Sequence, residues 1–448
     1  MFQNIIGRIT DYKRHFIELL VLAFPMMIGN LGQILIGATD VFVAARYDIN
    51  ALASVSIANS IIFTVFIIGI GLMTSISIIL SNMRGNRKPT KKYYAISALY
   101  GLVLSVIFCF VCLATIPLID FLGFDQSLVP TIKEYIFICS FSFPGVYLYQ
   151  SIKEFLQAHE IVNVPNIILI VAVIVHLIFD FLLVFGFGPI KSMGVIGVAI
   201  ATLVTRTLMG IFLFLYCAKL MKFKNIFNVD YVKQLIKVGT PIGISLLLEF
   251  LAFNMITLLI ARHSGIYAAT HNIVMTVAST TFMVPLAVSN AIAIKVGFYN
   301  GAKNYFEIKK YSQVGIITSS LFMTLCAIML LSFPAQILKL FTSDERVLTI
   351  GIPIMFIAGI FQIADGVQIS ASGVLKGLKM TNTVSICVLS GYWLVGLPLG
   401  VLLAYKFNLL LQGYWIGLAV SLAAMGLIMG FIIVKRLKRL RLEFSRAN

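Results

Sequence analysis

Six ionisable side chains lie inside stretches of sequence that are otherwise apolar, and these side chains are the best placed in the chain to do chemistry. They are Asp40, His176, Asp180, Arg206, Glu249 and Asp365. A charge at the centre of a membrane-spanning helix costs at least about 2.5–3.5 kcal/mol, so such a residue usually faces protein or water. Each of the six is therefore a candidate site residue. The alternative is a purely structural role, in which the residue pairs with a buried base or caps a broken helix.

The four acids fall into two pairs by depth. At about 1.5 Å per helical residue, Asp40 and Asp180 share a level in the N-terminal half, toward the outer face. Glu249 and Asp365 share a deeper level in the C-terminal half. Two acids that face one dry cavity tend to keep a proton, which an arriving cation displaces. The same carboxylates, with amide and hydroxyl oxygens, could instead bind Na⁺. We expect ion coupling at one or both pairs, with H⁺ or Na⁺ and no other cofactor.

Two further ionisable residues leave alternatives open. His176 precedes Asp180 by four residues and so lies on the same helix face, where it could share protons with Asp180 or donate a structural hydrogen bond. Arg206 could contact substrate or pair structurally with an acid or a carbonyl. Neutral polar residues in the same stretches are expected to line a cavity or to join helices by hydrogen bonds. They are Gln33, Asn59, Gln150, Asn254 and Gln362.

The composition indicates what must hold these residues in place. The 448 residues are 60% hydrophobic and only 11% charged, with a mean hydropathy of +1.01, whereas about a quarter of a soluble protein is charged. This excludes a soluble enzyme, a nucleic-acid-binding domain, a disordered protein and a secreted scaffold. The sequence predicts an all-α polytopic membrane protein.

Twelve apolar runs reach the roughly 20 residues needed to cross a bilayer. They lie at about 17–45, 51–81, 94–118, 132–153, 164–186, 194–219, 240–262, 267–295, 311–333, 348–375, 383–405 and 411–434. Of the 34 Lys and Arg residues, 26 fall on the side that holds both termini, seven on the other side, and Arg206 within a span. By the positive-inside rule both termini are cytoplasmic. The net charge of +17 therefore reflects membrane topology, and no nucleic-acid partner is expected.

An internal repeat divides the chain into halves. Pro25 and Pro241 are 216 residues apart, and the offset persists: Gln33 falls on Glu249 and Gly85 on Gly301. We predict an N-lobe at 1–218, a cytoplasmic linker at 219–239, a C-lobe at 240–434 and a basic cytoplasmic tail at 435–448. Two parallel six-helix repeats around a central cavity are typical of transporters. There is no phosphate loop, no metal-spaced His/Cys cluster and no Ser-His-Asp arrangement, so we expect a monomeric secondary transporter and not an enzyme.

Several motifs resemble those of the multidrug and toxic compound extrusion (MATE) family. They are Pro25–Gln33 (PMMIGNLGQ), Gly37–Asp40 (GATD), Ala51–Asn59 (ALASVSIAN), Gly186–Gly194 (GFGPIKSMG) and Gly197–Leu203 (GVAIATL). The resemblance covers the whole chain and includes its length, its twelve spans and its two lobes.

The resemblance implies an inner-membrane antiporter that exports cationic, amphipathic organic compounds in exchange for H⁺ or Na⁺ by rocking between outward- and inward-open states. It implies that Asp40 couples ions beside the pair His176 and Asp180, and that some branches of the family use acids at Glu249 and Asp365. Small organic cations and membrane lipids are the partners it suggests.

The sequence departs from the family pattern at three places. His176 stands where Asn is usual, which favours H⁺ over Na⁺ in the N-lobe. Both acid pairs are present, which blurs the assignment to one branch, and the loop Arg84–Lys88 is basic. The alternative within the superfamily is a flippase of lipid-linked oligosaccharide or lipid. The acidic character of the expected cavity favours a cationic cargo instead.

Overall fold

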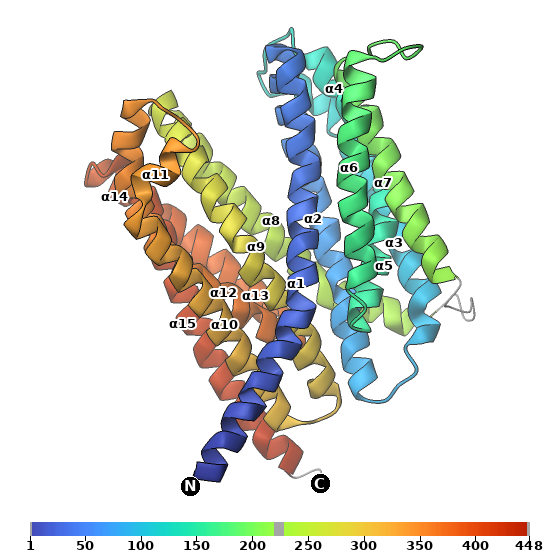
Figure 1. Cartoon of the computed structure of the whole chain (residues 1–448), viewed down its shortest axis with the longest axis vertical. Coiled ribbons are helices and arrows are strands. Elements are labelled where there is room, and N and C mark those ends of the chain that lie inside the picture. The colour runs from blue at the N-terminus through green and yellow to red at the C-terminus, as the bar shows by residue number, and fades with distance from the viewer. Residues whose placement is uncertain (1, 219–227, 446–448) are drawn as a thin grey trace. The chain divides into compact units, whose positions relative to one another are not determined.

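The structure is a computed structural model that describes residues 2–218 and 228–445, with side chains from Tyr12 onward. Within these ranges the chain is almost entirely helical (Figure 1). The linker predicted at 219–239 falls in part, and the end of the predicted tail entirely, outside the described residues.

The first half of the chain contains seven α-helices and two short 3₁₀ helices. They are α1 (Phe2–Tyr47), α2 (Ile49–Gly85), η1 (Lys91–Tyr93), α3 (Tyr94–Leu113), η2 (Ile116–Phe121), α4 (Val129–Ser140), α5 (Phe143–Ala158), α6 (Asn163–Phe185) and α7 (Val195–Ala218).

The second half follows the same order. It contains α8 (Val229–Ala261), α9 (Gly265–Gly301), α10 (Tyr305–Ser332), α11 (Pro334–Lys339), α12 (Glu345–Gly377), α13 (Thr381–Val388), the π-helical η3 (Leu389–Gly396), α14 (Leu397–Lys406) and α15 (Leu410–Ser445). The short η2 and α11 occupy matching places after the third long helix of each half, which supports the repeat seen in the sequence.

Eleven helices in the described part of the chain are long and apolar enough to cross a membrane. The remaining predicted span, the fourth at 132–153, is divided into α4 and α5 at Phe141 and Ser142. Pro144 explains the division, because it lies in the first turn of α5 and has no amide hydrogen to continue a helix from α4. The protein is thus a multi-pass helical membrane protein.

The described helices form two compact units. Unit 1 contains residues 1–27, 81–88 and 244–448, and unit 2 contains residues 28–80 and 89–243. The long helices α1, α2 and α8 therefore each contribute residues to both units. The boundary predicted at the linker concerns the sequence repeat, and it stays a prediction.

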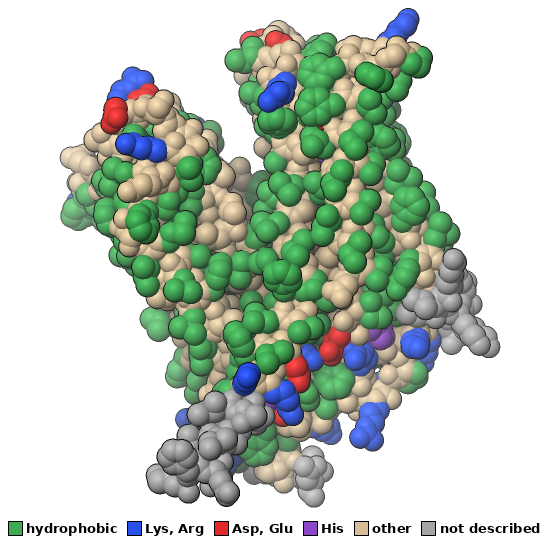
Figure 2. Space-filling model, in the orientation of Figure 1, with side chains coloured by type: hydrophobic (Ala, Val, Ile, Leu, Met, Phe, Trp, Pro, Cys, Tyr) green, Lys and Arg blue, Asp and Glu red, His purple; other side chains and the backbone are tan. Residues whose placement is uncertain are grey.

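In unit 2, backbone contacts bring α5 and α7 close together. A Cβ atom at Gly145 would lie 2.5 Å from Thr207 Cα, and one at Gly210 would lie 2.3 Å from the Gly145 carbonyl oxygen. Only glycine allows the two helices this approach. The contact fixes the part of α7 that carries Arg206. The outer flank of α6 and α7 is covered by hydrophobic side chains, as Figure 2 shows, which suits a surface that faces lipid.

Candidate functional site

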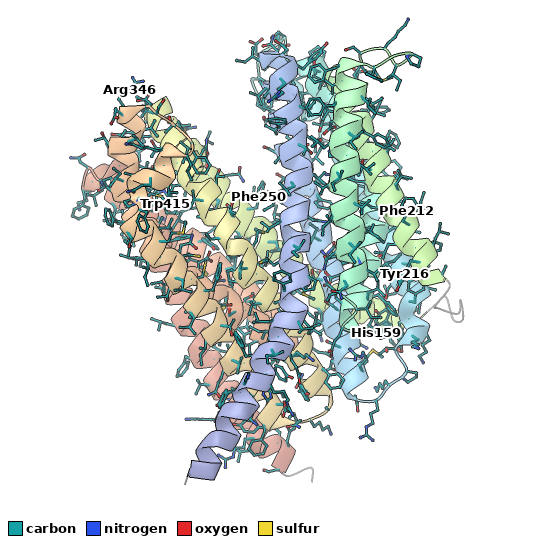
Figure 3. All side chains as sticks on the ribbon, viewed as in Figure 1. His159, Phe212, Tyr216, Phe250, Arg346 and Trp415 are labelled. Carbon is teal, nitrogen blue, oxygen red and sulfur yellow. The ribbon has the colours of Figure 1, made fainter. Side chains whose placement is uncertain are left out.

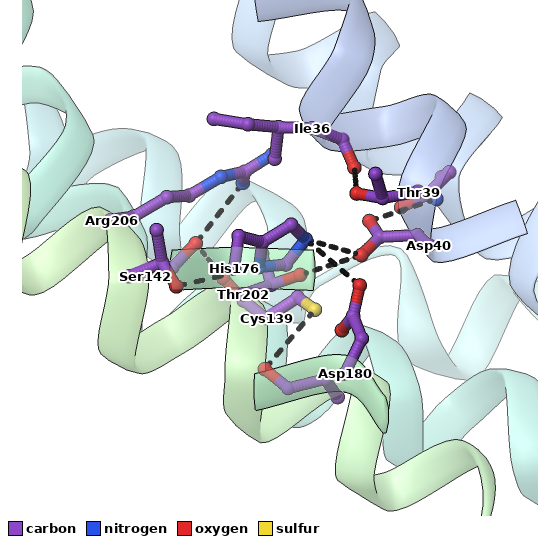
Figure 4. Close-up of polar contacts among 12 residues, drawn as sticks. Ile36, Thr39, Asp40, Cys139, Ser142, His176, Asp180, Thr202 and Arg206 are labelled. Atoms are coloured by element: carbon purple, nitrogen blue, oxygen red, sulfur yellow. Dashed lines mark hydrogen bonds and ion pairs between the residues drawn. The ribbon is translucent and has the colours of Figure 1, made fainter. Parts of the chain in front are cut away.

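Asp40 is the centre of a buried polar cluster in unit 2. It lies on α1 and is only 1% exposed. His176 Nε2 lies 2.9 Å from its Oδ1, and the Thr202 hydroxyl donates to the same oxygen at 3.2 Å. The Asn59 amide donates to Oδ2 at 3.4 Å, and the Tyr135 hydroxyl lies 3.3 Å from that oxygen. Side chains from α1, α2, α4, α6 and α7 thus meet at one carboxylate (Figure 4).

His176 lies between the two acids of this unit. Its Nε2 is 2.9 Å from Asp40 Oδ1 and 3.4 Å from Asp180 Oδ2, and all three residues are fully or almost fully buried. The spacing of four residues places His176 and Asp180 on one face of α6, as expected. The tertiary fold adds that Asp40 lies against the same imidazole nitrogen. One imidazole nitrogen therefore lies between two carboxylates, with a hydrogen bond to Asp40 and an ion-pair contact to Asp180.

The Asp180 carboxylate lacks hydrogen bonds. Neither of its oxygens receives one from the described residues, although Oδ2 makes the ion-pair contact with His176. A buried carboxylate without donors is costly to keep charged. One ligand atom each from Asp40, His176 and Asp180 lies within 4.8 Å of the others, a spacing that could also hold a cation. The cluster therefore gains stability from a bound proton or a bound cation.

Thr205 on α7 contacts the other nitrogen of the imidazole. Its hydroxyl oxygen lies 3.4 Å from His176 Nδ1. A hydroxyl both donates and accepts hydrogen bonds, so it can donate to a neutral imidazole and accept from an imidazolium. Thr205 thus suits a histidine that changes its protonation state.

Arg206 lies beside the cluster without touching its acids. One guanidinium nitrogen donates to the Ser142 hydroxyl at 3.2 Å, and the guanidinium lies 5.7 Å from the centre of the Phe66 ring. Ser142 occupies the break between α4 and α5. The hydrogen bond goes to a hydroxyl and not to the acid or carbonyl that the sequence suggested as a structural partner, and the role of Arg206 stays a prediction.

Unit 1 holds the other predicted pair in a different arrangement. The Tyr392 hydroxyl donates to Glu249 Oε1 at 3.2 Å. Asp365 is buried and makes no hydrogen bond with the described residues, and the charge of Glu249 acts on it. The charge of Lys376 also acts on Glu249. The two acids of unit 1 thus interact electrostatically with one another.

The neutral residues singled out from the sequence are dispersed. Only Asn59 contacts an acid of the two pairs. The Gln150 amide donates to Glu154 at 3.0 Å and the Gln362 amide to the Thr281 hydroxyl at 2.6 Å. Asn254 is exposed and donates to the backbone of its own helix, and Gln33 is half-buried without a hydrogen bond to any described residue.

Three hydroxyl residues of the cluster were not anticipated. Tyr135, Thr202 and Thr205 lie within apolar runs, where Thr commonly donates to the carbonyl one turn earlier in its own helix. Nothing in the sequence distinguishes them from Thr207, which does so at 2.7 Å. The one available signal is that Thr202 lies in the quoted run Gly197–Leu203 and, by helical spacing, on the same face as Thr205 and Arg206.

The donor set fits a proton better than a sodium ion. A hard cation prefers a shell of oxygen ligands. Here the central position between the two carboxylates belongs to an imidazole nitrogen, and Asn59 presents its amide nitrogen to Asp40. Imidazole and carboxylate together are the usual groups of a proton relay in membranes.

Comparison with known proteins identifies a family. The MatE family model matches residues 25–182 and 241–402, so the two matches begin at Pro25 and Pro241, the prolines that open the repeat. The multidrug resistance protein NorM of Photobacterium profundum is 26% identical over 431 residues, which cover 92% of this chain and 94% of that protein. A probable multidrug resistance protein NorM of Mesorhizobium japonicum is 30% identical over 427 residues, or 90% of each chain.

Solved structures show the same fold. The MATE transporter VcmN of Vibrio cholerae in its bent form has a TM-score of 0.88 at 20% identity, and covers 97% of this chain and 99% of that one. The eukaryotic MATE transporter AtDTX14 has a TM-score of 0.85 at 18% identity, with the same coverage. The twelve-helix architecture of two repeated halves predicted from the sequence is thereby confirmed.

Proposed function

The chain belongs to the MatE family of multidrug and toxic compound extrusion transporters, and from that premise we propose that it is a secondary antiporter that exports cationic, amphipathic organic compounds in exchange for protons. Relatives across the length of the chain are named as multidrug resistance proteins, which supports the cargo class. We propose that it acts as a monomer in the plasma membrane. Both termini are placed in the cytoplasm, because 26 of its 34 basic residues fall on the side that holds them.

The observation that carries proton coupling is the cluster of Asp40, His176 and Asp180. Two buried carboxylates flank one imidazole nitrogen, and Asp180 receives no hydrogen bond from the part of the chain that the structure describes. With one proton on the imidazole and one on Asp180, the cluster carries a single negative charge on Asp40, balanced by the imidazolium. Its polar atoms are then well matched to their surroundings.

An organic cation competes with these two protons for the negative charge of the cluster. A cation that approaches the cluster repels the imidazolium and favours the ionised form of Asp180, so a proton leaves. When the cation leaves on the outer side, the uncompensated carboxylates take up a proton again. The cluster favours either bound protons or a bound organic cation, but not both at once. Each outward passage of cargo therefore requires an inward passage of protons.

The pair Glu249 and Asp365 supports sodium coupling as a second candidate. It consists of two interacting carboxylates, of which Asp365 is buried and receives no hydrogen bond from the described part of the protein. Oxygen ligands of this kind suit a hard cation. The second candidate predicts transport that depends on Na⁺ and on unit 1, and that is indifferent to His176.

The test uses the purified full-length chain in proteoliposomes loaded with a fluorescent lipophilic cation such as ethidium. Export is measured in Na⁺-free buffer with a pH gradient imposed or collapsed, and then with a Na⁺ gradient at equal pH. We expect export to follow the pH gradient alone. Addition of ethidium to the detergent-solubilised protein in weak buffer should also release protons.

The control is Asp125→Asn, which removes an exposed carboxylate outside the spans. It should leave both signals unchanged, whereas Asp40→Asn should abolish both. Export that follows only the Na⁺ gradient would replace proton coupling by the second candidate. Failure to move any organic cation, together with scrambling of a labelled lipid, would favour the flippase.

A further inference from the structure

An elongated groove runs between α6 and α7 on the flank of unit 2. It has a volume of about 510 Å³ and lies between α6 from Val164 to Val175 and α7 from Thr205 to Tyr216. Ile167, Val171 and Phe212 at its mouth are each more than half exposed, while Ala172 and Met209 form its buried floor. Phe212 and Tyr216 lie one turn apart along α7 (Figure 3). The groove lies within one unit, and of its lining residues Thr205 also contacts His176 of the acid cluster.

The lining of the groove is chemically uniform. Its residues are Val, Ile, Leu, Ala, Met and Phe side chains except for Thr205 at one end and Tyr216 at the other, and no charged or amide side chain contributes. Water in such a groove would find too few partners to be held there. Both helices are candidate membrane spans, so the mouth opens toward hydrocarbon. The occupant must therefore be apolar along its length.

The dimensions of the groove match one leaflet of a bilayer. Eleven residue steps along α6 or α7 correspond to about 16 Å at 1.5 Å per residue. Half of the roughly 30 Å hydrocarbon thickness is about 15 Å. A narrow, apolar groove of this length suits one extended acyl chain better than a compact ligand.

The two ends of the groove give the occupant a direction. Tyr216 lies near the end of α7 and is 41% exposed, the position and character of an aromatic residue at a membrane interface. At the other end, Thr205 places its hydroxyl 3.4 Å from His176 Nδ1 and so adjoins the buried acid cluster. By the distribution of basic residues, the Tyr216 end belongs to the cytoplasmic leaflet.

We propose that the α6–α7 groove is a binding site for one acyl chain of a cytoplasmic-leaflet phospholipid. The glycerol end lies beside Tyr216 and the methyl end lies against Met209 and Thr205. The bound chain covers the membrane side of Thr205 and keeps water away from His176. This site is independent of which ion or cargo the protein moves, because lipid binding requires neither.

The test maps contacts with photoreactive lipids. The full-length protein is reconstituted into vesicles of phosphatidylethanolamine and phosphatidylglycerol that contain a trace of phosphatidylethanolamine with a diazirine at the end of one acyl chain or next to its ester. After illumination, labelled residues are located by mass spectrometry. The chain-end probe should label the Thr205–Met209 segment, and the ester-side probe should label the Tyr216 region.

Matched variants separate a built site from ordinary contact with lipid. Ala172→Phe fills the floor, whereas Ile174→Phe adds the same ring to an exposed position of α6 outside the groove. Ala172→Phe should lower labelling of Thr205–Met209 at least about tenfold, because several methylene contacts are lost, and Ile174→Phe should not. If Ala172→Phe does not fold, Leu208→Phe at the groove wall serves in its place.

Three outcomes would overturn the proposal. The first is equal labelling of the groove and of the exposed Ile174 face. The second is labelling by the ester-side probe at Thr205, which would reverse the direction. The third is a change from dimer to monomer in Ala172→Phe at unaltered lipid labelling, because the groove would then be an interface between two copies of the chain.

Discussion

Each unit carries one acid on the first helix of its repeat, Asp40 on α1 and Glu249 on α8, but the two positions do not correspond, and the second acids lie on the non-equivalent helices α6 and α12. The offset of 216 residues places Ile256 opposite Asp40 and Gln33 opposite Glu249. In unit 2 an imidazole and three hydroxyl or amide groups surround Asp40. In unit 1 Glu249 receives one hydrogen bond, from Tyr392, and Asp365 none from the described residues.

The segment of the second half that is equivalent to α6 in the repeat explains part of this difference. In the second half the corresponding segment is interrupted by the π-helical turn η3. This turn directs Tyr392 to Glu249 and the neighbouring Trp393 to the Leu248 carbonyl at 3.0 Å. π-Helical turns often occur at functional sites because they redirect side chains. A duplicated scaffold can thus hold two chemically different acid sites, one with an imidazole between its carboxylates and one in which a tyrosine hydroxyl donates to a single acid.

The largest expected effect tests whether unit 2 carries the coupling. Asp40→Asn should reduce proton-driven export about 100-fold or more, the scale on which positioned proton-transfer groups act. His176→Gln should do the same, because it removes the group that joins the two acids. Export from proteoliposomes under an imposed pH gradient measures both. Retention of pH-driven export in Asp40→Asn would remove the distinction between the units.

A smaller effect is expected in unit 1. Glu249→Gln and Asp365→Asn should each change proton-driven export no more than about fivefold, within the range of a single buried hydrogen bond. The same proteoliposome assay, repeated with a Na⁺ gradient, measures the change. A loss as large as that of Asp40→Asn would mean that both units couple ions.

Thr205→Val sharpens the description of the histidine. It keeps the side-chain volume and removes the hydroxyl that contacts His176 Nδ1, so export should fall about threefold to tenfold, as expected for one hydrogen bond. The dependence of export on pH should shift, because only the hydroxyl can serve both protonation states. Thr207→Val, whose hydroxyl bonds to its own helix, is the control. An identical pH profile in both variants would contradict the role assigned to Thr205.

The smallest effect concerns stability in unit 1. Tyr392→Phe removes the donor to Glu249 and should lower stability by about 0.6 kcal/mol, the average for hydrogen bonds between membrane helices. Thermal unfolding in detergent measures the change, with Tyr47→Phe at an exposed position as the reference. If Tyr392→Phe instead abolishes export at unchanged stability, Tyr392 belongs to a working ion site.

Much of the architecture could be predicted because each membrane-spanning helix corresponds to a continuous apolar run in the sequence. Apolar runs long enough to cross hydrocarbon must be helical, since no water is present to satisfy the backbone. The runs correspond to the observed helices, with two interruptions: Pro144 separates α4 from α5 within 132–153, and the π-helical η3 lies between α13 and α14 within 383–405. That proline was visible in the sequence, but its consequence depended on the local backbone.

The sequence by itself determined which side chains are expensive to bury, and so it identified Asp40, His176, Asp180, Glu249 and Asp365. It also determined that His176 and Asp180 share a helix face, because that relation depends only on helical periodicity. Only the tertiary structure decided that Asp40 meets the same imidazole nitrogen, that Thr205 rather than Thr207 faces it, and that Arg206 turns to Ser142. Such contacts depend on the rotation and spacing of neighbouring helices, which are set by close packing at residues such as Gly145 and Gly210.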